Sequence, residues 1–320
     1  MKVIWREILL SVIMAAILPG ILLEWPVERA APEKTEFRPI EPTHGMNRVR
    51  LTMKLRREDG TVEELDMDEY LVGVVLAEMP STFEAEAKKA QAVAARTFAR
   101  KAWVTGGKHG DGSVCESAGC CQAWLPKDKY LELGGSDWAI REARAAVEAT
   151  SGYVLTYEGE LIEATYFSCS GGSTEDAVAV WGTDYPYLRA VDSPGEEGAA
   201  HHSDTISYPK EVLEVKLGVE LTGNWLGKTS YTAGGGVDTI DIGGKTFTGK
   251  ELRSLLGLRS TAFILEEEGE LIQFITRGFG HRVGMSQYGA DAMAASGSNW
   301  KEILNYYYGG TTLELTNGEE

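Results

Sequence analysis

"LVGVVLAEMPSTFEAEAKKAQAVAARTFAR", residues 71–100, decides the fold because it encodes two consecutive helices separated by a proline. Apolar residues recur at helical spacing after an acidic cap at Asp66 or Asp68, and Pro80 ends this first helix. A second helix follows over about residues 84–104, and the alanines along one side of it permit a neighbouring element to approach closely. The stretch therefore predicts a tightly packed helical pair.

The first helix ends in a carboxylate, Glu78, directly before Met79 and Pro80. A carboxylate in the last helical turn faces exposed carbonyls, and apolar neighbours exclude water, so both effects raise its pKa. Such a group can stay protonated near neutral pH and donate a proton. The plainer interpretation is that Glu78 reaches solvent or pairs with Arg96 or Lys88. The residues alone leave both interpretations open.

The segments on either side of this pair alternate between strands and helices. A hairpin with a turn at Asp59–Gly60 precedes it, and a helix over about residues 137–150 and a second hairpin follow. Residues 205–270 mix helices with a glycine-rich hairpin and are predicted to form a subdomain or an insertion. We predict an α+β fold of mixed helices and short antiparallel strands around a substrate cleft.

Residues 1–25 have the pattern of a short cytoplasmic tip followed by one transmembrane helix. Lys2 and Arg6 precede an apolar run from Ile8 to Leu23. Counting from Val3, with Arg6 and Glu7 able to snorkel, the segment reaches the ~20 residues that a single span needs. The basic end predicts that everything after Glu24 is extracytoplasmic. A cleaved signal peptide is the alternative. Residues 26–45 then form a linker, residues 46–315 the main domain, and residues 316–320 a tail.

The composition excludes one class of partner. The chain of 320 residues carries a formal net charge of −17, with 31 basic and 48 acidic residues. Nucleic-acid binding requires clustered Lys and Arg that displace counterions from phosphates. We therefore expect no nucleic-acid partner.

Four ordered blocks resemble the stage II sporulation protein D family across about residues 46–315. They read "DEYLVGVVLAEMP…KAQAVAARTFA", "YFSCSGGSTED…VWG", "LGLRSTAF" and "GFGHRVGMSQYGADAMAASG". The resemblance implies a membrane-anchored lytic transglycosylase of endospore formers, which cuts peptidoglycan glycan strands during engulfment of the forespore. It implies single-pass placement in the mother-cell membrane, with the domain facing the intermembrane space, and work alongside stage II sporulation proteins P and M.

The resemblance also implies roles for particular residues. Glu78 stands at the position of the family's catalytic acid/base, and Arg96 matches an arginine that the family carries near the site. Candidate substrate contacts come from the two glycine-rich blocks: Tyr166, Ser168, Ser170, Gly171, His281, Gln287 and Tyr288. Their plainer interpretations are a surface ion pair for Arg96 and turn or packing roles for the others. The chain departs from the family pattern at Phe167 and Cys169, and at Arg282.

His109, Cys115 and Cys121 recur at six-residue intervals in a glycine-rich loop. Family members that hold zinc through one His and two Cys in this loop imply a zinc site here, with Glu78 or water completing a tetrahedron. A disulfide among Cys115, Cys120 and Cys121, or free thiols, are the alternatives. Zinc is not required for the sugar chemistry.

The sequence is compatible with three functions. The first is glycan cleavage, which needs only one carboxylate when the sugar's own hydroxyl is the nucleophile. The second is a non-enzymatic peptidoglycan binder that enhances a cell-wall amidase. The third is a zinc or thiol hydrolase built on Cys169 and His281.

Overall fold

The computed structural model describes residues 51–316. The predicted anchor, the linker and residues 317–320 of the predicted tail lie outside the described residues. Among residues 51–316, no helix is both long and apolar enough to cross a membrane.

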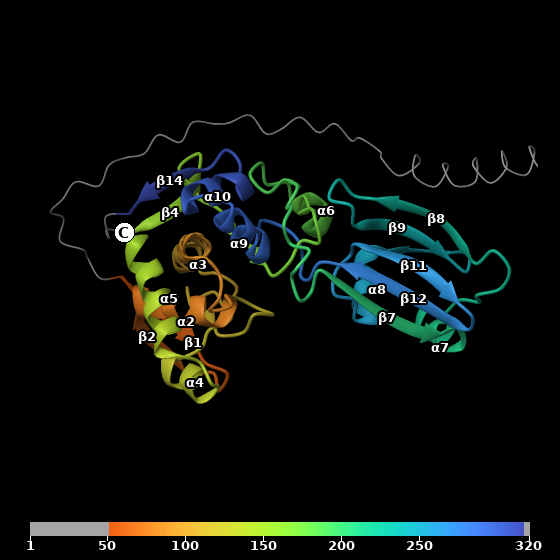
Figure 1. Cartoon of the computed structure of the whole chain (residues 1–320), viewed down its shortest axis with the longest axis horizontal. Coiled ribbons are helices and arrows are strands. Elements are labelled where there is room, and N and C mark those ends of the chain that lie inside the picture. Colours follow the sequence, from red (N-terminus) through yellow and green to blue (C-terminus); the bar gives the residue numbers. More distant parts are fainter. Residues whose placement is uncertain (1–50, 317–320) are drawn as a thin grey trace, which may run out of the picture. The chain divides into compact units, whose positions relative to one another are not determined.

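The fold is α+β, as predicted, and its elements alternate along the chain (Figure 1). The helices are α2 (Met67–Glu78), α3 (Ala85–Thr105), α4 (Lys127–Glu132), α5 (Asp137–Ala149), α6 (Ala177–Trp181), α7 (Lys210–Leu217), α8 (Gly249–Leu256), α9 (Gln287–Ala295) and α10 (Trp300–Tyr307). The strands are β1 (Thr52–Arg56), β2 (Val62–Asp66), β3 (Val114–Cys115), β4 (Tyr153–Tyr157), β5 (Glu160–Leu161), β6 (Tyr166–Phe167), β7 (Ser203–Pro209), β8 (Leu226–Tyr231), β9 (Val237–Ile242), β10 (Lys245–Thr248), β11 (Phe263–Glu268), β12 (Leu271–Arg277), β13 (Met285–Ser286) and β14 (Thr312–Leu315).

Helix α3 is the central element of the first half of the fold. It packs against α2, α5, α9, α10 and β4 (Figure 1). Its alanines are buried on several sides, which allows these neighbours to approach closely. The predicted helical pair is confirmed: Asp66 caps α2 by accepting hydrogen bonds from the N–H groups of Asp68 and Glu69, and Pro80 follows the end of α2.

Most strand pairs are antiparallel hairpin partners, as predicted, but two pairs are parallel. Strand β3 pairs with β1, and β13 pairs with β6, in the sheet orders β2-β1-β3 and β13-β6. The prediction of antiparallel strands alone is therefore wrong for these pairs. Each is a two-residue contact between segments far apart in the chain, so no local turn signal marks it.

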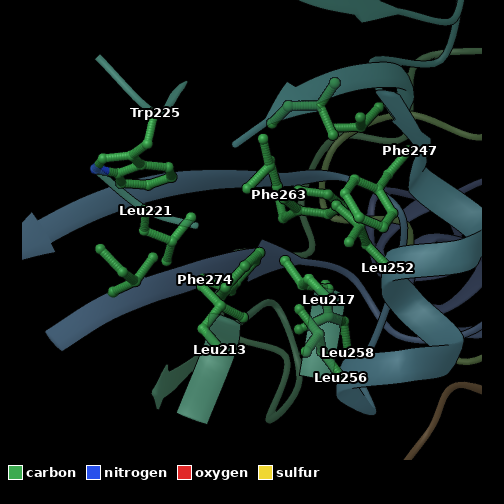
Figure 2. Packing of buried hydrophobic residues seen from close by; sticks show 14 residues of the cluster. Leu213, Leu217, Leu221, Trp225, Phe247, Leu252, Leu256, Leu258, Phe263 and Phe274 are labelled. Carbon is green, nitrogen blue, oxygen red and sulfur yellow. The ribbon is translucent and has the colours of Figure 1, made fainter. Parts of the chain in front are cut away.

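Residues 203–277 contain a hydrophobic core of their own. Two three-stranded sheets, β10-β9-β8 and β11-β12-β7, are joined by α7 and α8. Side chains from both sheets and both helices fill the space between them, with Phe263, Phe274 and Leu252 among the buried members (Figure 2). The strands of these two sheets lie between Ser203 and Arg277, so this part of the fold is slightly longer than the predicted segment 205–270.

A buried ion pair connects this core to the neighbouring loops. Arg282 is only 2% exposed and its guanidinium lies 3.2 Å from Glu175 Oε1. The same guanidinium donates to the carbonyls of Ser170, Ser173 and Gly234. Because a buried charge is costly without partners, these contacts fix the loops around residues 170–175 and 234 together.

Gly73 permits a close contact within α2. A Cβ added at Gly73 would lie 2.2 Å from Nε1 of Trp124, whose indole donates to the Tyr70 carbonyl. The next residue, Leu125, donates its N–H to the Gly73 carbonyl at 3.2 Å. The segment around Trp124 thus lies directly on α2.

We predict that Gly73→Ala lowers the free energy of unfolding by about 1–3 kcal/mol, because the new methyl group displaces the Trp124 ring. Chemical denaturation of the full chain measures this change. Gly309→Ala is the control, since no atom lies within 4 Å of a Cβ built there. Equal stabilities of the two variants would contradict the prediction.

Candidate active site

Glu78, the last residue of α2, is held by two hydrogen-bond donors. The backbone N–H of Ala123 donates to Oε1 at 2.8 Å, and Nε2 of Gln287 donates to Oε2 at 3.2 Å. Burial raises the pKa of Glu78, while both donors favour the ionised form and oppose that rise. The net pKa lies above the ordinary value. The carboxyl can therefore hold a proton, and the site also contains groups that stabilise the carboxylate.

The two donors come from segments distant in sequence. Gln287 is the first residue of α9 and is buried, and its amide also donates to Gln91 of α3 at 3.5 Å. Ser286 caps the same helix by accepting from the Gly289 N–H. Ala123 contributes only its backbone, so no side-chain pattern could have identified it.

Two cavities meet at Glu78. The larger, of about 640 Å³, extends towards Tyr166, Trp181 and His281, and the smaller, of about 420 Å³, extends towards Tyr288 and Tyr130. Both are lined by Glu78, Ser168, Phe279 and Gln287. An extended ligand could therefore pass across the carboxyl and occupy both sides of it.

A hydrogen-bonded chain of side chains supports the cavity beside Glu78. The Tyr70 hydroxyl donates to Oε1 of Gln122 at 2.6 Å, and Nε2 of Gln122 donates to the Tyr166 hydroxyl at 2.8 Å. Burial, and then the nearby Glu78 carboxylate, raise the pKa of Tyr166 well above its ordinary value. Tyr166 is a neutral phenol that lines the larger cavity.

His281 lines the larger cavity as a neutral ring. Its Nδ1 accepts the Val283 N–H at 3.1 Å, so the neutral ring carries its proton on Nε2. Burial, and then the positive charge of Arg253, lower the pKa of His281 to about 4. The ring contacts Phe167 and Trp181, with centroid distances of 5.6 and 5.3 Å. His281 is thus suited to packing and hydrogen bonding rather than to proton transfer near neutral pH.

Ser168 and Tyr288, two further predicted contacts, also reach the cavities. Ser168 lines both, and Tyr288 lines the smaller one, where its ring packs edge-on against Phe83 at 4.9 Å. The structure therefore brings together Glu78, Tyr166, Ser168, His281, Gln287 and Tyr288.

Ser170 and Gly171 lie behind the cavity wall, and neither lines either cavity. The buried carboxylate of Glu196 accepts from the N–H groups of both residues and from the Ser170 hydroxyl. The Cys169 thiol donates to the same carboxylate at 3.0 Å. Burial, and then this carboxylate, raise the pKa of Cys169 to about 12. A thiol so placed is a poor nucleophile, which argues against a thiol hydrolase.

Arg96 also lies away from the cavities. It is 1% exposed, and its guanidinium donates to the carbonyls of Val147, Thr150 and Tyr153. The guanidinium lies at the C-terminal end of α5, where the helix dipole favours a positive charge. Arg96 also lies 3.6 Å from Asp68. It is therefore neither a surface residue nor a lining residue, and its contacts connect α3 to the end of α5 and to α2, the helix that ends in Glu78.

His109, Cys115 and Cys121 converge with Cys120, and their ligand atoms all lie within 4.8 Å of one another. Nε2 of His109 lies 3.9 Å from the Cys120 sulfur and 3.6 Å from the Cys121 sulfur, and these two sulfurs are 3.9 Å apart. Zinc bond lengths of about 2.3 Å to sulfur and 2.0 Å to nitrogen place tetrahedral ligands about 3.5–3.8 Å apart. The four groups fit a zinc ion.

Cys120 is the fourth group of this cluster, whereas Glu78, which we expected to complete a tetrahedron if water did not, faces Ala123 and Gln287. The six-residue spacing missed Cys120 because it selects only one of two adjacent cysteines. All four cysteines are free, and a disulfide would need sulfurs only about 2.05 Å apart.

Comparisons with known proteins identify the family of this chain. Residues 56–157, which include Glu78 and the cysteine loop, match the family described as "Stage II sporulation protein". The stage II sporulation protein D of Bacillus subtilis is 40% identical over 264 residues, which cover 81% of this chain and 77% of that protein. That of Bacillus amyloliquefaciens is 38% identical over 294 residues, covering 90% and 85%. The chain belongs to the stage II sporulation protein D family.

A third relative of the family has a different name. The "Amidase enhancer" of Bacillus subtilis is 29% identical over 303 residues, which cover 76% of this chain and 40% of that protein. Family membership makes this chain a sporulation protein. The names of the relatives do not decide between glycan cleavage and amidase enhancement.

We predict that Glu78→Gln becomes more stable relative to the native protein as the pH rises from 4 to 8. The folded-state pKa is raised, so above the ordinary value of about 4.3 the unfolded chain ionises more readily. The native protein loses stability as the pH rises through this window, whereas glutamine cannot ionise. Melting temperatures at several pH values measure the difference.

Glu64→Gln, the same substitution at an exposed position of β2, is the matched control, measured at the same pH values. A difference between Glu78→Gln and the native protein that stays constant or shrinks with rising pH would contradict the raised pKa.

Proposed function

We propose that the chain is a lytic transglycosylase that cleaves the bond between N-acetylmuramic acid and N-acetylglucosamine in peptidoglycan strands. The observation that carries this proposal is a single partly buried carboxyl, Glu78, with a raised pKa, where two cavities meet. The other carboxylate that lines the larger cavity, Glu163, is ion-paired with Lys101 at 2.8 Å. One proton-transferring carboxyl suits a reaction in which the sugar supplies its own nucleophile.

In the first half of the reaction, protonated Glu78 donates its proton to the glycosidic oxygen, and the bond from that oxygen to C1 of the muramic acid breaks. The departing sugar keeps the proton as a hydroxyl hydrogen. The Ala123 and Gln287 donors stabilise the carboxylate that remains on Glu78.

In the second half, the C6 hydroxyl of the same muramic acid attacks C1, and the Glu78 carboxylate accepts the hydroxyl proton. The product is a 1,6-anhydro sugar, and Glu78 is protonated again. Because the hydroxyl belongs to the reacting ring, its effective concentration is high without a bound water.

We further propose that the four-group cluster binds zinc as a structural ion. Zinc bound by four protein ligands stabilises a loop and leaves no open position for substrate. His109, Cys115, Cys120 and Cys121 would hold it, and Ala123, which donates to Glu78, follows two residues after the last ligand. The ligands would thereby fix the donor that orients the carboxyl.

The setting of this reaction is also proposed from family membership. The domain would act outside the cytoplasm, anchored in the mother-cell membrane by residues 1–25, on the peptidoglycan between the two membranes during engulfment. Stage II sporulation proteins P and M are the expected partners.

A second candidate function is that of a peptidoglycan-binding protein that enhances a separate amidase. The name of the third relative, "Amidase enhancer", suggests this function. Such a protein would bind glycan strands in the same cavities and release no product.

We predict that the full chain releases 1,6-anhydro-muramyl products from peptide-free glycan strands and that Glu78→Gln lowers this rate at least about 100-fold. Mass spectrometry of the digest identifies the products. Cys169→Ala is the matched control and should retain activity, since its thiol is buried behind the wall. Absence of products from the native chain would favour the amidase enhancer, and loss of activity in Cys169→Ala alone would favour the hydrolase.

We predict that the purified chain binds one zinc ion and that His109→Ala or Cys115→Ser abolishes binding. Elemental analysis measures the zinc content. In the cobalt-substituted chain, Cys120→Ser should weaken the sulfur-to-cobalt charge-transfer absorption, and Cys169→Ala should leave it unchanged. A chain without metal whose intact mass shows loss of two hydrogens would instead establish a disulfide.

A further inference from the structure

Two aromatic side chains, Trp181 and Tyr185, line the larger cavity together with Glu78, and we call them the aromatic wall. Trp181 is the last residue of α6 and is 40% exposed, while Tyr185 is half-buried in the segment that follows. Leaving so large an apolar surface in water forgoes the free energy that its burial would provide. An exposed aromatic inside a cavity is typical of a ligand-binding surface.

Rings packed beside the aromatic wall hold its orientation. The Trp181 ring lies 5.3 Å from the His281 ring, which in turn lies 5.6 Å from Phe167. Tyr185 packs against Tyr187 at 5.7 Å, and the Tyr187 hydroxyl accepts the N–H of Glu163 at 3.1 Å. Because these rings are in place before any ligand binds, little side-chain entropy is lost on binding.

The backbone around Trp181 is also fixed. Gly182 ends α6 in the left-handed conformation, with φ of 75°, and donates its N–H to the Val178 carbonyl at 2.9 Å. From the neighbouring core, Lys250 donates to the Val180 carbonyl. The helix end that carries the indole is therefore fixed by these two hydrogen bonds.

Polar groups line the same cavity as the aromatic wall. Lys108, Glu163 and Thr183 contribute an ammonium group, a carboxylate and a hydroxyl. A pyranose ring has an apolar face of C–H groups and a rim of hydroxyl and acetamido groups. Aromatic faces beside hydrogen-bonding side chains, in a cavity of about 640 Å³, match both parts of such a ring.

We propose that Trp181, supported by Tyr185, stacks on an N-acetylhexosamine ring of the glycan strand and forms a sugar subsite next to the scissile bond. This subsite deepens the proposed function and rests on it for the identity of the ligand. His281 acts in it as a positioning residue that supports the Trp181 ring.

The test is the affinity of chitotetraose and of peptide-free glycan strands for the full chain carrying Glu78→Gln, which prevents turnover. Isothermal titration calorimetry measures the dissociation constants. We expect Trp181→Ala in this background to weaken binding about tenfold, and Trp181→Phe, which keeps a smaller ring, to weaken it less.

Trp103→Ala is the matched control, because Trp103 is 37% exposed and lines neither cavity. Its affinity should equal that of the Glu78→Gln parent. A Trp181→Phe variant tests the subsite even if Trp181→Ala does not fold.

The outcomes separate the subsite from the reaction. Equal affinity of the parent and the Trp181 variants would overturn the subsite and leave glycan cleavage intact. Binding that depends on Trp181, together with no anhydro product from the native chain, would support the subsite and overturn the transglycosylase. No binding of either ligand by the parent, together with no anhydro product from the native chain, would overturn both.

Discussion

The contact between the Glu78 carboxyl and its two donors, Ala123 N–H and Gln287 Nε2, is the interaction on which the site depends. It joins the end of α2, the loop after the cysteines and the start of α9, which are widely separated in sequence. Burial favours the protonated carboxyl and the donors favour the ionised one, so both forms that an acid/base needs are accessible. Much of the surrounding structure serves to place these three segments within reach of one another.

Three buried or partly buried glutamates differ in role because their surroundings differ. Glu196 is surrounded by donors from the 169–171 turn, and Glu175 is paired with Arg282. Both are nearly inaccessible, at 2% and 1% exposed, and they fix loops. Glu78 has fewer donors and lines two cavities, so a ligand can reach its carboxyl.

The sequence predicts the local parts of this fold well. Helix α2 with its Asp66 cap, helix α3 and the α+β class follow from spacing and capping that neighbouring residues encode. Glu78, Gln287 and the cysteine loop were found because they lie in recognisable blocks. Arg96 and Ser170 were misplaced because a motif shows which residues recur and does not show which way they face. Ala123, Cys120 and the aromatic wall were missed since a backbone donor, one of two adjacent cysteines and an exposed ring depend on tertiary contacts.

The central claim is that the folded protein raises the pKa of one carboxyl. A site-specific titration tests it directly: the full chain is labelled with ¹³C at the glutamate side-chain carboxyls, and the Glu78 resonance is assigned by its absence from Glu78→Gln. The account predicts a midpoint above the ordinary glutamate value of about 4.3. A midpoint at or below that value would show that Glu78 is already ionised when substrate binds, and it would contradict the account.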